Sequence, residues 1–227
     1  MNIKVEECNN PAQDVKAFVR NLVQENSESL SMFIYNQTSA LHSYLAQREV
    51  TRAQMILENV GAKSHTRADL FIATEQETGA RIGFALLAPH LNNPNGAAII
   101  MIAVSAESRK KGVFTQIINC IKQKYCDNLT LSCKPEMVNF YKNFGFIPVG
   151  VRQTQIAMSL APEISGGGIS TVDDAEVMKN PKVIQKYTDL ITRRGKAAVE
   201  KEVEKWQADF VRGEQYAEQF WKELQSV

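Results

Sequence analysis

Near the N-terminus, apolar residues recur at spacings of three and four, the period of a helix with one buried face. Pro11 is typical of the first turn of a helix. Val15, Val19 and Leu22 follow it on one helical face. More apolar positions between residues 29 and 60 predict one or two further helices. The first quarter of the chain is therefore expected to be helical.

After residue 61 the pattern changes to short apolar runs separated by turn formers, which predicts strands. The first three runs span residues 69–74, 81–87 and 97–104. Short links join these runs, so we expect an antiparallel meander. The third run contains no polar side chain, which is typical of a strand at the centre of a sheet.

Helices and strands alternate beyond this meander. Ile117, Ile118 and Ile121 indicate an amphipathic helix. A second helix begins at Pro135 and is stopped by Gly145. Further strands are predicted at residues 129–132, 146–151 and 155–160. The predicted fold class is therefore α/β (α+β), with a mixed, mostly antiparallel central sheet flanked by helices.

A linker rich in Gly and Ser separates this sheet from an α-helical C-terminal extension. We place a domain at residues 1–161, the linker at 162–172 and a helical arm at 173–227. The linker predicts few contacts between the domain and the arm. Within the arm, residues 199–224 carry a heptad-like apolar stripe. This stripe either packs back on its own domain or joins the chain to a second copy or a larger assembly.

Composition and charge narrow the possible functions. The 227 residues are 44% hydrophobic, and 26 Lys and Arg face 25 Asp and Glu, for a net charge of +1. Such a balance does not favour nucleic acid or an anionic membrane as partner. The longest apolar run, residues 97–104, is too short to cross a bilayer, and no secretory leader is evident, so a cytoplasmic location is expected. The four cysteines form no Cys-x-x-Cys pair, and no metal site is predicted.

A basic loop with a glycine follows the third predicted strand. It contains Arg109, Lys110, Lys111 and Gly112, and a helix begins directly after it. The start of a helix exposes unpaired backbone N–H groups at the positive end of the helix dipole. This geometry binds a pyrophosphate, and the three cations add positive charge around it. The alternative is a solvated basic turn that caps the helix.

A second motif, FYKNFGF at residues 140–146, closes the next predicted helix. The two motifs and the strand between them resemble the GCN5-related N-acetyltransferase (GNAT) family, whose loop reads Arg/Gln-x-x-Gly-x-Gly/Ala and whose helix ends aromatic-Tyr-x-x-x-Gly-Phe. The resemblance covers residues 10–161 and excludes the arm. It implies the GNAT fold and the transfer of an acetyl group from acetyl-coenzyme A (acetyl-CoA) to an amine on a small molecule or a protein.

The resemblance also implies roles for individual residues. It places the pyrophosphate of the coenzyme on the loop residues Arg109, Lys110, Lys111, Gly112, Val113 and Phe114. Main-chain groups of Ile102 and Val104 are expected to bind the cosubstrate and the oxyanion, and Lys134 is placed with these residues. Tyr141 is expected to protonate the departing thiolate, which is basic enough to accept a proton from a phenol. The alternative for Tyr141 is a core aromatic.

The sequence departs from the family pattern in three places. Phe114 replaces a small residue, Lys134 replaces an Asn, and residues 97–104 lack the Glu that often serves as base. Coenzyme binding is therefore better supported than turnover. Other candidate bases are Glu75, Glu77, Glu107 and His90, although each of them is expected to be a surface or loop residue. The alternatives to an enzyme are a coenzyme A sensor and a non-catalytic GNAT-like scaffold or structural protein, for example of a phage or mobile element, that joins an assembly through its arm.

Overall fold

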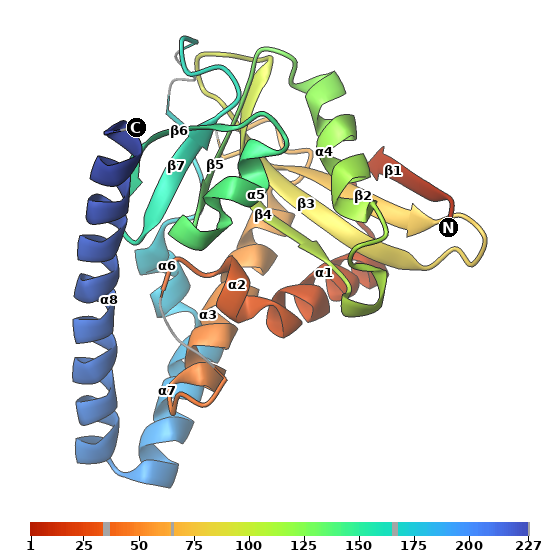
Figure 1. The fold of residues 1–227 in the computed structure, drawn as a ribbon. Coiled ribbons are helices and arrows are strands. Elements are labelled where there is room, and N and C mark those ends of the chain that lie inside the picture. Colours follow the sequence, from red (N-terminus) through yellow and green to blue (C-terminus); the bar gives the residue numbers. More distant parts are fainter. Residues whose placement is uncertain (34–36, 65, 165–167, 227) are drawn as a thin grey trace.

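The computed structural model describes residues 1–33, 37–64, 66–164 and 168–226, and Figure 1 shows how they are arranged. Seven strands form one sheet in the order β1-β2-β3-β4-β5-β7-β6. The strands are β1 (Ile3–Glu7), β2 (Asp69–Glu75), β3 (Arg81–Pro89), β4 (Gly96–Val104), β5 (Asn128–Cys133), β6 (Ile147–Arg152) and β7 (Gln155–Ser159). The predicted mixed, mostly antiparallel sheet is confirmed. The edge strand β1 was missed, although Ile3 and Val5 alternate with polar residues along it.

The sheet has two parts that meet at a short seam. Strands β1 to β4 are antiparallel neighbours, as the meander predicts, and β5, β7 and β6 form a second antiparallel set. Between the two sets, β4 pairs with β5 in parallel, and only Gly96–Ala98 takes part from β4. The strands separate beyond Ala98. Just beyond this stretch, β4 bulges at Ile100, because Leu86 pairs with Met101 and Leu87 with Ile99.

Eight α-helices are described. They are α1 (Gln13–Glu25), α2 (Ser27–Leu30), α3 (His42–Glu58), α4 (Val113–Lys124), α5 (Val138–Lys142), α6 (Asp174–Lys179), α7 (Pro181–Arg194) and α8 (Lys196–Gln225), with 3₁₀ turns at Ala106–Ser108 and Pro135–Met137. Because side chains alternate along a strand, Leu70 and Ile72 of β2 pack under α1 and α3, whereas Phe71 and Ala73 pack under α4. Within the described residues, no helix is long and apolar enough to cross a membrane.

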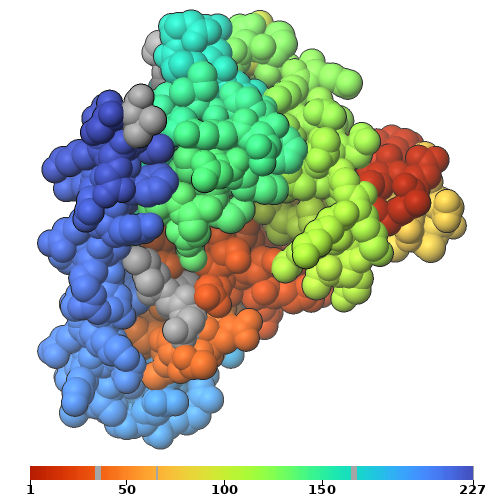
Figure 2. Space-filling model, in the orientation of Figure 1, coloured from red at the N-terminus to blue at the C-terminus, as the bar shows by residue number. Residues whose placement is uncertain are grey.

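The C-terminal arm is helical, as predicted, and it packs against the domain. Val183 and Leu190 of α7 and Val199 of α8 are buried together with Leu41 and Leu45 at the start of α3. Figure 2 shows the arm, in blue, lying along one side of the molecule. The sequence predicts few contacts across the linker, whereas the structure has an apolar core there. The domain boundaries themselves stay a prediction, and residues 165–167 of the predicted linker lie outside the described residues.

The apolar stripe of residues 199–224 lies on one unbroken helix that continues through Gly213. Near its C-terminal end, Ala217 is fully buried in the main core, and Phe220, Trp221 and Leu224 pack against that core. The stripe therefore packs on its own domain, which is one of the two alternatives that its pattern left open.

Candidate active site

The seam between β4 and β5 opens into a cleft of about 740 Å³, which we call the coenzyme cleft. Its walls are β4 from Ile99 to Val104, β5 from Leu131 to Cys133, and residues at the starts of α4 and α5. The pairing of the two strands stops at Ala98, so the strands separate and neither fills the space between them. The cleft is therefore a direct consequence of the short ladder.

The edge of β4 presents unpaired main-chain groups to this cleft. Ser105 N–H donates to the carbonyl oxygen of Ile82 at 2.9 Å, which fixes which residues of β4 bond to β3. Hydrogen bonding alternates along an antiparallel ladder, so the main-chain groups of Ile102 and Val104 point away from β3. The two residues named from the sequence thus turn main-chain N–H groups toward the cleft on the described part of β4, whereas the C=O of Val104 accepts a hydrogen bond from Arg109.

The basic loop lies at the mouth of the cleft and ends in a helix start. Gly112 precedes the first residue of α4 with a φ of 81°, a left-handed conformation that favours glycine. A Cβ at this position would meet nothing within 4 Å, so the loop backbone is open to a ligand. No side chain caps the helix, and its first N–H groups remain available to an anion. Val113 and Phe114 follow and line the cleft.

The three cations of the loop are placed differently. Arg109 lines the cleft, where its Nε donates to the carbonyl oxygen of Val104 at 3.3 Å and its guanidinium also bonds to Asn26. Lys110 lines the cleft in a left-handed conformation, with a φ of 61°. Lys111 is exposed and does not line the cleft. The structure therefore brings two of the three predicted cations to the site.

Tyr141 lies in the wall of the cleft within a cluster of aromatic rings. Its ring centroid is 6.0 Å from that of Phe114 and 5.9 Å from that of Phe146, both in edge-on contact. Burial raises the pKa of the Tyr141 phenol above its ordinary value, and the nearby Cys133 adds to this increase. The phenol is therefore protonated at neutral pH, which is the form that a general acid requires.

Lys134 also lines the cleft, at the boundary with α2. Its Nζ donates to the carbonyl oxygen of Glu28 at 3.1 Å. This bond explains why a lysine can occupy the position, since the long side chain bridges from the end of β5 to a helix of the N-terminal segment.

None of the candidate bases lines the cleft. Glu75 ends β2 and accepts a hydrogen bond from Thr78, and Glu77 and Glu107 are exposed. His90, treated from the sequence as a surface or loop residue, is instead 5% exposed, and its Nε2 lies 3.1 Å from Thr130 Oγ1. The buried histidine is a correction to the sequence analysis. A Cβ on Gly96 would lie 2.5 Å from Nδ1 of His90, so the imidazole ring packs closely against this glycine.

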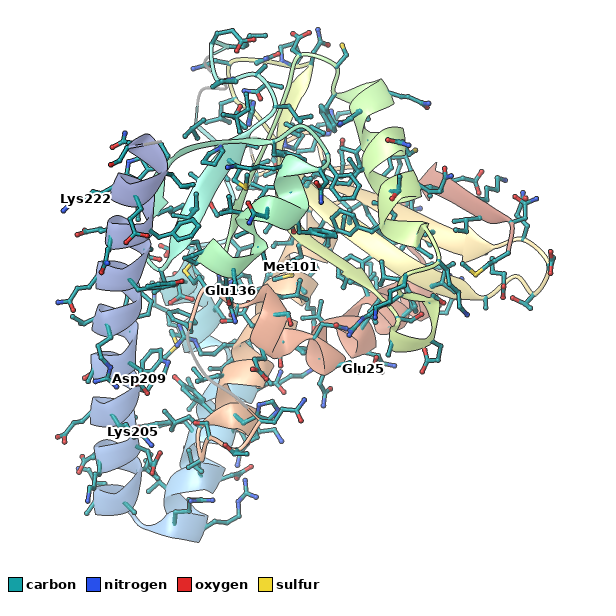
Figure 3. All side chains as sticks on the ribbon, viewed as in Figure 1. Glu25, Met101, Glu136, Lys205, Asp209 and Lys222 are labelled. Atoms are coloured by element: carbon teal, nitrogen blue, oxygen red, sulfur yellow. The ribbon has the colours of Figure 1, made fainter. Side chains whose placement is uncertain are left out.

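Several residues that line the cleft were not predicted from the sequence. Asn26 and Ser29 reach the cleft from the end of α1 and from α2, and Glu136 reaches it from the 3₁₀ turn before α5. Figure 3 shows Glu136 between the start of α5 and α2. No local pattern marks these residues, because the fold alone brings α2 against the seam. In the described part of the chain, no group of His, Cys, Asp or Glu is arranged to hold a metal ion.

Comparison with known proteins agrees with this geometry. Residues 66–148, which contain the meander, the basic loop and Tyr141, match the family model of the acetyltransferase (GNAT) domain. A search of curated proteins gave no match.

Solved structures share the GNAT fold of this chain. One is the PaiA N-acetyltransferase from Thermoplasma acidophilum, in complex with coenzyme A, at 15% identity and a TM-score of 0.51, covering 70% of this chain and 98% of that one. Another is the histone acetyltransferase HPA2 and related acetyltransferase from Corynebacterium glutamicum, at 16% identity and a TM-score of 0.52, covering 73% and 99%. The sequence-based recognition of the family and the fold is therefore confirmed.

Proposed function

We propose that the protein is an N-acetyltransferase that moves an acetyl group from acetyl-CoA to an amine. The observation that carries this proposal is that one cleft holds the open helix start at Gly112, the free edge of β4 and the protonated phenol of Tyr141. These three features supply an anion site, main-chain hydrogen bonds and an acid, which are the requirements of acyl transfer from a thioester.

Different residues along the cleft have different roles in this reaction. The N–H groups at the start of α4, with Arg109 and Lys110, hold the pyrophosphate. Main-chain groups of Ile102 and Val104 bind the extended arm of the coenzyme and orient the carbonyl group. Acetyl-CoA, when bound, supplies the acetyl thioester. The amine nitrogen bonds to the acetyl carbon as the carbon–sulfur bond breaks, and Tyr141 donates its proton to sulfur. The proton that the amine releases returns through water to the Tyr141 phenolate.

The alternative of a non-catalytic GNAT-like scaffold has less support. It was suggested by the missing acid on β4 and by the helical arm. The stripe of the arm is packed on its own domain, so it does not offer a ready surface for an assembly. The coenzyme cleft is also open, and the phenol of Tyr141 lines it. The cytoplasmic location stays a prediction.

The test is a pair of measurements on Tyr141→Phe. Calorimetric titration with acetyl-CoA should give the same affinity as the wild type, because the aromatic ring is kept. Release of free thiol in the presence of a mixture of amines should fall by about 10²–10⁴-fold, the usual effect of losing a general acid.

Tyr216→Phe is the matched control, because Tyr216 is an exposed tyrosine on α8. It should change neither measurement. Equal rates for Tyr141→Phe and the wild type would assign Tyr141 to the core. A wild type that does not bind acetyl-CoA would contradict the proposal as a whole.

A further inference from the structure

A second hollow, of about 480 Å³, lies beside the coenzyme cleft and is lined on one side by the arm. We call it the arm hollow. Glu28 and Lys134 line it from the domain, and Arg194, Glu202, Lys205 and Asp209 line it from α7 and α8. Lys134 lines both spaces, so the arm hollow adjoins the coenzyme cleft at this residue. In Figure 3, Lys205 and Asp209 point from α8 toward the domain, whereas Lys222 points outward.

The arm hollow is lined by charged side chains of both signs, and several of them form no ion pair. Asp209 is paired with Arg212 on the same helix, and Lys134 is held by the carbonyl oxygen of Glu28. Within the described part of the chain, the carboxylates of Glu28 and Glu202 and the cations of Arg194 and Lys205 form no ion pair. Two unpaired anions and two unpaired cations therefore line one hollow.

Trp206 adds an aromatic ring to the same wall. Its indole Nε1 is buried away from solvent and has no hydrogen-bond partner among the described residues. Trp206 lines the arm hollow, and its ring packs edge-on against Phe33 at a centroid distance of 5.4 Å.

We propose that the arm hollow binds the acceptor, and that this acceptor is a small zwitterionic amine of the size of an amino acid. Glu28 lies on the domain side beside Lys134, where it would hold the ammonium group next to the coenzyme cleft. Arg194 and Lys205 lie on the arm and would bind the carboxylate, Arg194 with two parallel hydrogen bonds. That the bound amine is acetylated rests on the proposed function, whereas its binding does not.

Binding can be measured without the coenzyme, because the chain has two tryptophans and one of them lines the arm hollow. In a Trp221→Phe variant, the fluorescence reports on Trp206 alone. Serine, glutamate and lysine are titrated in parallel with their carboxamides and their N-acetyl derivatives. We expect a saturable change in fluorescence with at least one free amino acid. Its carboxamide and its N-acetyl derivative, which each lack one charged group, should bind about tenfold more weakly, a difference of about 1.4 kcal/mol. Equilibrium dialysis of the same amino acids against the wild type gives the same result without a substitution.

Two lysines on α8 provide a matched pair of variants. Lys205→Ala should raise the dissociation constant of the amino acid about tenfold and reduce the preference over the carboxamide. Lys222→Ala, on the same helix but pointing outward, should change neither. Arg194→Ala should behave like Lys205→Ala.

The outcomes separate the two proposals. Amino acids and carboxamides that bind equally, or a complete absence of saturable binding, would overturn the arm hollow as an acceptor site even if acetyl-CoA binds. Binding of amino acids without binding of acetyl-CoA would support the hollow as a zwitterion site and contradict the proposed function.

Discussion

The two parts of the sheet differ in how they are covered. Strand β3, near the centre of the first part, is buried along seven consecutive residues between α1 and α3 on one face and α4 on the other. In the second part, the edge strand β6 leaves Ile147 at 50% and Val149 at 43% exposure, and its cover includes α8, the last helix of the chain. The first part is closed by elements near it in sequence, whereas the second depends on the arm.

The comparison shows why the functional surfaces lie where they do. The coenzyme cleft opens at the seam, since β4 has only three residues paired to β5. The arm hollow opens where the arm crosses from α3 to β6 and β7. Both spaces therefore lie at joints between separately packed parts, where no single element fills the interior.

Of the changes that test this difference between the two parts, removal of residues 173–227 should destabilise the protein most. The deletion removes Val177, Val183, Leu190 and Val199 and thereby exposes their buried partners Leu41, Tyr44 and Leu45 at the start of α3. Burial of three such side chains contributes about 5–9 kcal/mol, which is comparable to the whole stability of a domain. We expect aggregation or loss of cooperative unfolding in urea. Cooperative unfolding of the truncated chain would instead support the sequence-based expectation that residues 1–161 fold alone.

Leu190→Ala tests the same contact with one side chain. Leu190 is 3% exposed on α7, so its truncation should lower the free energy of unfolding by about 2–5 kcal/mol. Ile184→Ala is the matched control on the same helix, because Ile184 is 52% exposed, and it should cost less than about 0.5 kcal/mol. Similar losses for both variants in denaturant titrations would show that α7 does not pack as described.

Gly112→Asp tests whether the start of α4, at the mouth of the coenzyme cleft, binds the pyrophosphate. The added carboxylate lies at the helix start that is proposed to hold the pyrophosphate, and we expect at least about a 100-fold loss of acetyl-CoA affinity, or about 2.7 kcal/mol. Gly79→Asp has the same left-handed backbone and equally open surroundings in the turn between β2 and β3. It should be destabilised to a similar extent but bind acetyl-CoA normally. Equal affinity in both variants, by calorimetry, would remove the loop from the binding site.

The smallest predicted effect concerns pH and the first part of the sheet. Burial alone would raise the pKa of Asp69, but hydrogen bonds from Lys124, Tyr125 and Arg67 outweigh it and hold the pKa below its usual value. The carboxylate therefore stabilises the fold above the ordinary Asp pKa of about 3.9, and this contribution is lost as the pH falls through the lower, folded-state value.

Asp69→Asn should thus be less stable than the wild type at neutral pH, and the difference should shrink in acid. Asp14→Asn removes an exposed partner of Arg81 and should show a much smaller difference. Urea titrations between neutral and acidic pH measure the difference in the free energy of unfolding between Asp69→Asn and the wild type. A difference that does not change with pH would contradict this assignment.

The sequence by itself determined the local elements and the two motifs. Periodicity located β2, β3, β4, α4 and the arm helices, because a strand or helix with one buried face repeats its apolar residues at a fixed spacing. Gly112 and Tyr141 were identified from short motifs, and both line the cleft. These signals depend on neighbours a few residues apart.

Only the tertiary structure decided how the parts meet. The separation of β4 and β5, the burial of His90 against Gly96 and the docking of the arm all join segments far apart in the chain. The charges of the arm hollow come from residues as distant as Glu28 and Asp209. Hydrophobic periodicity predicts that one face of an element will be buried, but it does not say which other element covers that face. Packing of the whole chain decides this.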